Sequence, residues 1–168
     1  NPNHKNWIGI GNTRNMHIRI ERAFVKIQAD AFFLPFKQVF NFVILGLNSL
    51  LLFKDNDRIR ILREVERITL RQGRIFIDII NGFSLKEEEY TISTYRKGKE
   101  YIKLQMKPER FKDKYILHYR YIINSNGIHS VNKDLEIYPV DFERIKSILE
   151  MTGFAIKNVW GEYDLSPY

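Results

Sequence analysis

The chain has 168 residues, of which 44% are hydrophobic and 14% aromatic, and 27 Lys and Arg against 20 Asp and Glu give a formal net charge of +7. This length and composition exclude a disordered chain and predict one ordinary domain with a buried core. The complete absence of cysteine excludes disulfides, thiolate nucleophiles and cysteine-ligated metals, and the four histidines are dispersed, so we expect no metal site.

The sequence also limits which binding partners and which cellular compartment we expect. A positive net charge favours polyanions such as RNA without requiring one. The longest apolar run, residues 39–53, is interrupted by polar residues and is too short to cross a bilayer, and the N-terminus does not resemble a signal peptide. We therefore expect a cytoplasmic protein with no membrane partner. Because the sequence begins with Asn1 rather than Met, we expect a processed chain or a fragment.

The first part of the chain alternates strands and a helix. Residues 7–10 (Trp-Ile-Gly-Ile) are predicted to form a short strand, and a helix capped near Asn12 follows it. A second strand begins at Phe24 and ends at Asp30. The continuous apolar run 40–45 is typical of a strand buried on both faces, so these strands are predicted to lie in a parallel sheet.

A helix and a further strand follow. Asp55 and Asp57 suit a helix start, Gly73 suits a left-handed helix stop, and residues 74–80 are predicted as the next strand. The apolar stripe of this helix consists of Ile61, Leu62, Val65 and Ile68. The alternation predicts a layered α/β architecture with right-handed crossovers.

The pattern changes after residue 81 to alternating runs, which predict an inserted antiparallel sheet. Two turn sequences, Lys97-Gly98-Lys99 and Ser125-Asn126-Gly127, predict hairpins. The strands are expected at 90–95, 100–106, 114–123 and 128–138. A helix opened by Pro139 and Asp141 and stopped by Gly153, and then a strand over 154–160, return to the α/β pattern. The expected divisions of this one domain are 1–81, 82–138 (the insert) and 139–168.

Three stretches resemble class I S-adenosylmethionine-dependent methyltransferases. They are 28–36 (QADAFFLPF), 40–49 (FNFVILGLNS) and 61–78 (ILREVERITLRQGRIFID), and two further stretches, 153–154 and 163–168, resemble the end of the same fold. The resemblance implies a Rossmann-like, mostly parallel sheet, S-adenosylmethionine as cofactor and S-adenosylhomocysteine as product. It also implies that the inserted sheet acts as a lid that selects the methyl acceptor.

The resemblance assigns roles to particular residues. Asp30, with Ala31 beside it, would meet the adenine amino group, and Met16 would pack on the adenine. Residues after the strand 40–45 would line the methyl-donor pocket, namely Gly46, Asn48 and Ser49. Each has an ordinary structural alternative, because Asp30 could start a turn, Asn48 and Ser49 could cap a helix, and Met16 could fill the core.

The chain departs from the family at both ends of the sheet. No stretch corresponds to the first strand with its Gly-rich turn or to the last strand, and the place of the ribose-binding acid is held by Gly11, with Asn12 as a weak substitute. In an alternative alignment Gly9 and Gly11 form a degenerate Gly-rich turn. A missing central strand would leave buried backbone groups unpaired, at about 1–3 kcal/mol each. We therefore expect that the chain is a fragment, that another segment or a partner chain completes the sheet, or that the fold is rearranged.

Two functions are compatible with these features of the sequence. The first is a methyltransferase, or a fragment of one, that acts on a small molecule rather than RNA, with catalysis expected in the full-length parent protein. The second is a non-catalytic methyltransferase-like subunit that binds a protein partner or RNA. No catalytic residue is assigned, because neither His118 nor His129 has a carboxylate partner identifiable from the sequence. A run of arginines that includes Arg60 and Arg67 is interpreted as a solvated helix face.

Overall fold

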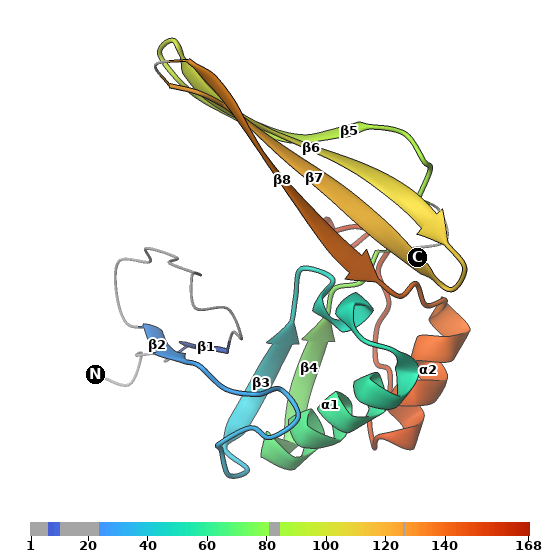
Figure 1. The fold of residues 1–168 in the computed structure, drawn as a ribbon. Coiled ribbons are helices and arrows are strands. Elements are labelled where there is room, and N and C mark those ends of the chain that lie inside the picture. The colour runs from blue at the N-terminus through green and yellow to red at the C-terminus, as the bar shows by residue number, and fades with distance from the viewer. Residues whose placement is uncertain (1–6, 11–23, 81–84, 126) are drawn as a thin grey trace. The chain divides into compact units, whose positions relative to one another are not determined.

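The computed structural model describes residues 7–10, 24–80, 85–125 and 127–168 (Figure 1). The chain divides into two compact units. The first unit comprises Asn1–Val43, Asn56–Ile75 and Leu149–Tyr168, and the second comprises Ile44–Asp55 and Phe76–Ile148. Among the described residues, none of the helices combines the length and the apolar content needed to span a bilayer.

The first two strands form a parallel pair. β1 (Trp7–Ile10) lies beside β2 (Phe24–Ile27), with Trp7 opposite Phe24 and Ile10 opposite Ile27. The predicted strand at 7–10 and the parallel pairing are confirmed, although β2 ends before Asp30. The helix predicted between these strands lies outside the described residues.

A second strand pair lies on either side of the first long helix in the sequence. β3 (Phe40–Leu45) pairs with β4 (Thr69–Ile77), and their arrows point the same way in Figure 1. The expectation that β3 is buried on both faces is wrong, because Phe42 and Ile44 are 46% and 48% exposed. Such burial requires a covering layer on each face, and the described residues leave these two side chains uncovered.

The helix between β3 and β4 is α1 (Asp55–Ile68). Its predicted apolar stripe is confirmed, since Ile61, Leu62, Val65 and Ile68 are all buried. The helix ends at Ile68, and the Thr69 hydroxyl donates a hydrogen bond to the Val65 carbonyl at 2.6 Å.

Gly73 does not stop this helix, so that prediction is wrong. It lies inside β4, which begins at Thr69 rather than at residue 74. A Cβ at Gly73 would lie 2.9 Å from the Leu70 carbonyl oxygen and 3.0 Å from that of Phe40. Glycine is therefore required here by the close approach of backbone, not by a left-handed turn.

The predicted antiparallel insert is confirmed as a four-stranded sheet with strands in sequence order. The strands are β5 (Tyr90–Lys97), β6 (Glu100–Phe111), β7 (Lys114–Asn124) and β8 (Ile128–Ile137). Gly98 and Gly127 have positive φ angles of 64° and 130°, as the two predicted hairpins require. Lys112, in the turn between β6 and β7, also has a positive φ, of 56°.

The helix α2 (Phe142–Met151) has the predicted caps. The Asp141 carboxylate accepts a hydrogen bond from the Arg144 amide at 2.7 Å, and Gly153 has a φ of 89° beyond the last turn. The strand predicted over 154–160 is wrong. Of residues 154–160, only Trp160 makes a bridge to a described residue, an isolated one with Pro167, so this segment has no ladder that would make it a strand.

Candidate functional site

The loop that follows β3 is held in an unusual backbone conformation. Leu47 and Asn48 have φ angles of 55° and 58°, both in the left-handed region, and the short 3₁₀ helix η1 (Ser49–Leu52) begins directly after them. For leucine this region costs about 1–2 kcal/mol, whereas asparagine adopts it more readily. Strained backbone of this kind concentrates at ligand and catalytic sites, which marks residues 46–49 as a candidate site.

Hydrogen bonds from the segment after β4 hold this loop. The Leu47 amide donates to the Asp78 carboxylate at 3.0 Å, and the Ile80 amide donates to the side-chain oxygen of Asn48 at 2.6 Å. The Asp78 amide also donates to the Leu45 carbonyl at 3.0 Å. The ends of β3 and β4 are thereby fastened together, and the strained loop is one part of that junction.

These contacts bear on the helix-cap alternative for Asn48 and Ser49. Asn48 occupies the N-cap position of η1 but makes no side-chain cap, because its oxygen is bound by Ile80. The Ser49 hydroxyl makes no hydrogen bond to a described residue and is half-buried. At Gly46 an added Cβ would lie 3.6 Å from Ile44, so packing does not require glycine there. The loop therefore offers the Asn48 amide nitrogen and the Ser49 hydroxyl, while the Leu47 and Ser49 amides and the Gly46 and Asn48 carbonyls are already hydrogen-bonded.

Asp30 forms a turn, which is one of the two roles that the sequence suggests for it. Its carboxylate accepts the Phe32 amide at 2.9 Å, and its carbonyl accepts the Phe33 amide at 3.0 Å, with Ala31 inside the turn. Within the described part of the chain, the other carboxylate oxygen has no hydrogen-bond donor. Asp30 belongs to the first unit and loop 46–49 to the second. Their expected common cleft stays a prediction.

The segment after Asp30 is fixed to α1 by one ion pair. Arg67 pairs with Glu64 at 2.8 Å and donates to the carbonyls of Leu34 and Phe36 at 2.8 and 2.7 Å. Glu64 in turn accepts the Leu34 amide at 2.9 Å. The hydrogen bond from Arg67 lowers the pKa of Glu64. The interpretation of the arginine run as a solvated face is confirmed for Arg67, whose side chain is 45% exposed, although the same side chain also binds the 34–36 backbone.

Sequence reasoning missed Asp78. The signal was available, because an acidic residue directly after a buried strand lies where an α/β sheet places its ligands, but residue 78 was included in the predicted strand. Of the remaining predicted site residues, Gly9 lies in β1, and Asn12 and Met16 lie outside the described residues.

His118, which had no partner identifiable from the sequence, binds two carboxylates in the folded sheet. Its Nδ1 lies 2.8 Å from Asp134 on β8, and its Nε2 lies 2.9 Å from Glu109 on β6. Both ring nitrogens can donate only when the imidazole is protonated. The hydrogen bonds to Asp134 and then to Glu109 therefore raise the pKa of His118.

We expect this triad to make the stability of the sheet depend on pH. A raised folded-state pKa adds stability that is fully present below the unfolded value, about 6.5, and is lost as the pH rises through the folded-state pKa. The melting temperature of the wild type should exceed that of His118→Gln at pH 6, and the gap should narrow above neutrality. Thermal melts of both proteins across pH measure this, and a gap that stays constant or widens contradicts it.

Comparison with known proteins places the fold. No protein-family model and no curated protein matches the chain, but solved structures do. The sugar N-methyltransferase KedS8 from Streptoalloteichus matches 95% of this chain with a TM-score of 0.78 and 16% identity, and the chain spans 66% of KedS8. A S-adenosylmethionine-dependent methyltransferase from Clostridium acetobutylicum matches 98% of the chain with a TM-score of 0.78 and 13% identity, over 70% of its own length.

A third structure contains the cofactor. It is S-adenosylmethionine-bound CalS10, an amino pentose methyltransferase from Micromonospora echinaspora, which matches 84% of this chain with a TM-score of 0.72 and 9% identity. The chain has the class I methyltransferase fold. It spans 61% of the length of CalS10. Loop 46–49 follows β3, and the Asp78–Ile80 segment follows its paired strand β4.

Proposed function

We propose that this protein is a S-adenosylmethionine-dependent methyltransferase, or part of one, that acts on a small molecule. The observation that carries the proposal is the strained loop at 47–48, which lies at a strand end of a methyltransferase fold and is held there by Asp78. Two of the similar proteins are described as a sugar N-methyltransferase and an amino pentose methyltransferase. This similarity favours a small acceptor over RNA.

The described residues fit part of a donor site. S-adenosylmethionine, when bound, supplies an activated methyl group to a nucleophilic atom of the acceptor. The second carboxylate oxygen of Asp30 is free to accept the adenine amino group while the first keeps the turn closed. Loop 46–49 supplies the Ser49 hydroxyl and the Asn48 amide nitrogen. The protein contributes mainly proximity and orientation, which is how this fold can act with few catalytic side chains.

Calorimetric titration with S-adenosylhomocysteine tests the proposal on the longest natural form of the protein. We expect binding, and we expect Asp30→Asn to weaken it about tenfold, since a charge-assisted hydrogen bond is lost. The amide oxygen of this variant can still accept the Phe32 amide, so the turn is retained. Asp57→Asn, which removes an exposed carboxylate from the same unit, is the matched control and should bind as the wild type does.

The absence of heat at high ligand concentration would contradict the proposal and favour the non-catalytic subunit. One observation supports that second function, because the Asn48 oxygen is already committed to the Ile80 amide and is not available to a ligand. Equal binding by the wild type and Asp30→Asn would leave donor binding intact but remove Asp30 from the site.

A further inference from the structure

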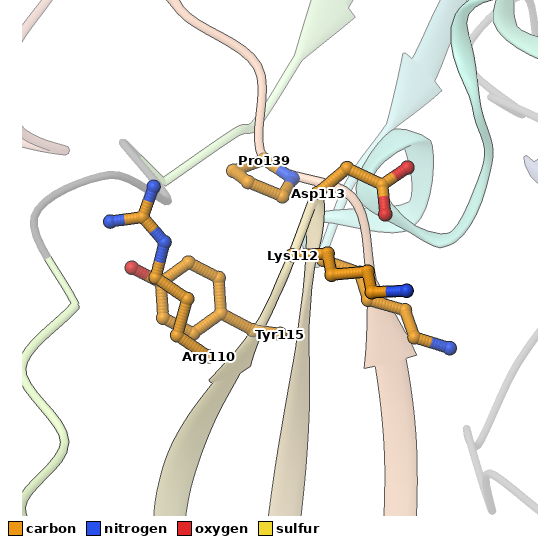
Figure 2. A pocket seen from close by; sticks show the side chains of 6 residues that line it. Arg110, Lys112, Asp113, Tyr115 and Pro139 are labelled. Carbon is orange, nitrogen blue, oxygen red and sulfur yellow. The ribbon is translucent and has the colours of Figure 1, made fainter.

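The turn between β6 and β7 forms one wall of a pocket of about 280 Å³ in the second unit. It is lined by Arg110, Lys112, Asp113, Lys114, Tyr115 and Pro139, whose side chains Figure 2 shows around the ends of the two strands. Typical pockets for drug-sized ligands begin at about 300 Å³. This pocket therefore suits one charged group of a ligand rather than an entire large molecule.

The pocket has an excess of positive charge. Its one carboxylate, Asp113, is already paired with Lys54 at 3.6 Å, and Lys114 is paired with Glu136. Among the described residues, no carboxylate pairs with the side chain of Arg110 or Lys112. Arg110 and Lys112 are thus without a carboxylate partner, and Figure 2 shows them on opposite sides of the strand ends, with Arg110 beside Tyr115.

Tyr115 adds a neutral donor. Tyr115 is 3% exposed. Its hydroxyl makes no hydrogen bond to a described residue and is not completely enclosed by protein. A phenolic hydroxyl, a guanidinium and an ammonium group are all donors, and the last two cannot accept. Such a set matches an anion and disfavours a cationic ligand.

Lys112 occupies a backbone position that favours glycine. Its φ is 56°, in the left-handed region, where residues other than glycine, asparagine and aspartate are uncommon. The turn therefore has a charged side chain at a position where glycine, which has no side chain, would fit most easily. This distinguishes it from the β5–β6 turn, which has Gly98 at the corresponding left-handed position.

We propose that this pocket binds the anionic group, a phosphate or a carboxylate, of a small molecule. If the proposed function holds, that molecule is the methyl acceptor. Within the second unit, Lys54 contacts Asp113 and lies 5.0 Å from the centre of the Tyr138 ring, and the Tyr138 amide donates to the Leu51 carbonyl at 2.7 Å. The pocket is thereby tied to the segment that directly follows loop 46–49.

Titration of the whole protein with inorganic phosphate and, separately, with acetate tests this proposal by NMR. We expect shifts of the Arg110, Lys112 and Tyr115 amides, and weaker binding as salt approaches about 0.15 M, because charge pairing is screened. The double variant Arg110→Gln/Lys112→Gln should weaken binding about tenfold. Tighter binding of phosphate or of acetate identifies which acid the pocket prefers.

The double variant Lys97→Gln/Lys99→Gln is the matched control. It removes two exposed charges from the β5–β6 hairpin of the same sheet and should leave phosphate binding unchanged. The proposal is overturned if neither anion shifts the pocket signals, or if both double variants weaken binding equally, as general attraction to a basic surface would predict. Neither result depends on the donor, so failure here is separable from failure of S-adenosylhomocysteine binding.

Discussion

Replacing Gly73 by alanine is expected to lower the free energy of unfolding by about 2–3 kcal/mol, the range of a badly overpacked site. The added Cβ would meet two carbonyl oxygens, those of Leu70 and Phe40, at 2.9 and 3.0 Å. Backbone atoms cannot move aside as a flexible side chain can. The substitution should therefore force β3 and the start of β4 apart, at the pairing that supports the candidate site.

Urea unfolding followed by circular dichroism measures this effect. Gly46→Ala is the matched control, because the nearest atom to its new Cβ, on Ile44, lies at an ordinary 3.6 Å. We expect this control to change stability by no more than about 0.5 kcal/mol. Equal destabilisation by the two substitutions would show that glycine flexibility, rather than the close contact at Gly73, determines stability.

Replacing Asp78 by alanine is expected to weaken S-adenosylhomocysteine binding at least about tenfold. The Asp78 carboxylate holds the Leu47 amide at 3.0 Å and thereby opposes relaxation of two left-handed residues. Without it, Leu47 can return to an ordinary conformation, and the ligand must then restore the strained loop. Leu47 is 89% exposed, so little packing is lost when the loop moves.

Asp78→Asn separates this positioning role from simple destabilisation. Its amide oxygen can still accept the Leu47 amide, so binding should stay within a few-fold of the wild type. Titration calorimetry measures affinity and thermal melting measures stability for both variants. A loss of affinity matched by a large loss of stability in Asp78→Ala, or equal losses of affinity in the two variants, would contradict the positioning role.

The elements with strong local signals were predictable from the sequence. The α1 stripe, the caps of α2 and the glycine turns of the antiparallel sheet each depend on residues close together in the chain, and all are confirmed. The two errors at Gly73 and at 154–160 have a different origin. Local turn chemistry suggests a helix stop at Gly73, but Thr69, Leu70 and the distant Phe40 together leave no space for a Cβ there. The composition of 154–160 suggests a strand, but no described strand pairs with it.

The candidate site was predictable only in outline. The position of a site after 40–45 follows from strand order, but the bonds that shape it join residues about thirty positions apart, such as Asn48 with Ile80. The partners of His118 were likewise hidden, because they follow from the strand registers set by the β6–β7 and β7–β8 turns. Sequence patterns located His118 and Asp134 on strands, but they ended the preceding strand at 106, before Glu109, and did not give the pairing.

The most direct test of the central claim is to map S-adenosylhomocysteine onto the amide signals of the longest natural form of the protein. The claim is that the methyl donor binds beside the strained loop after β3. It predicts that the Leu47, Asn48 and Ile80 signals shift in a saturable way. Saturable shifts confined to other parts of the chain, or no shifts at a ligand concentration that saturates the calorimetric titration, would contradict it.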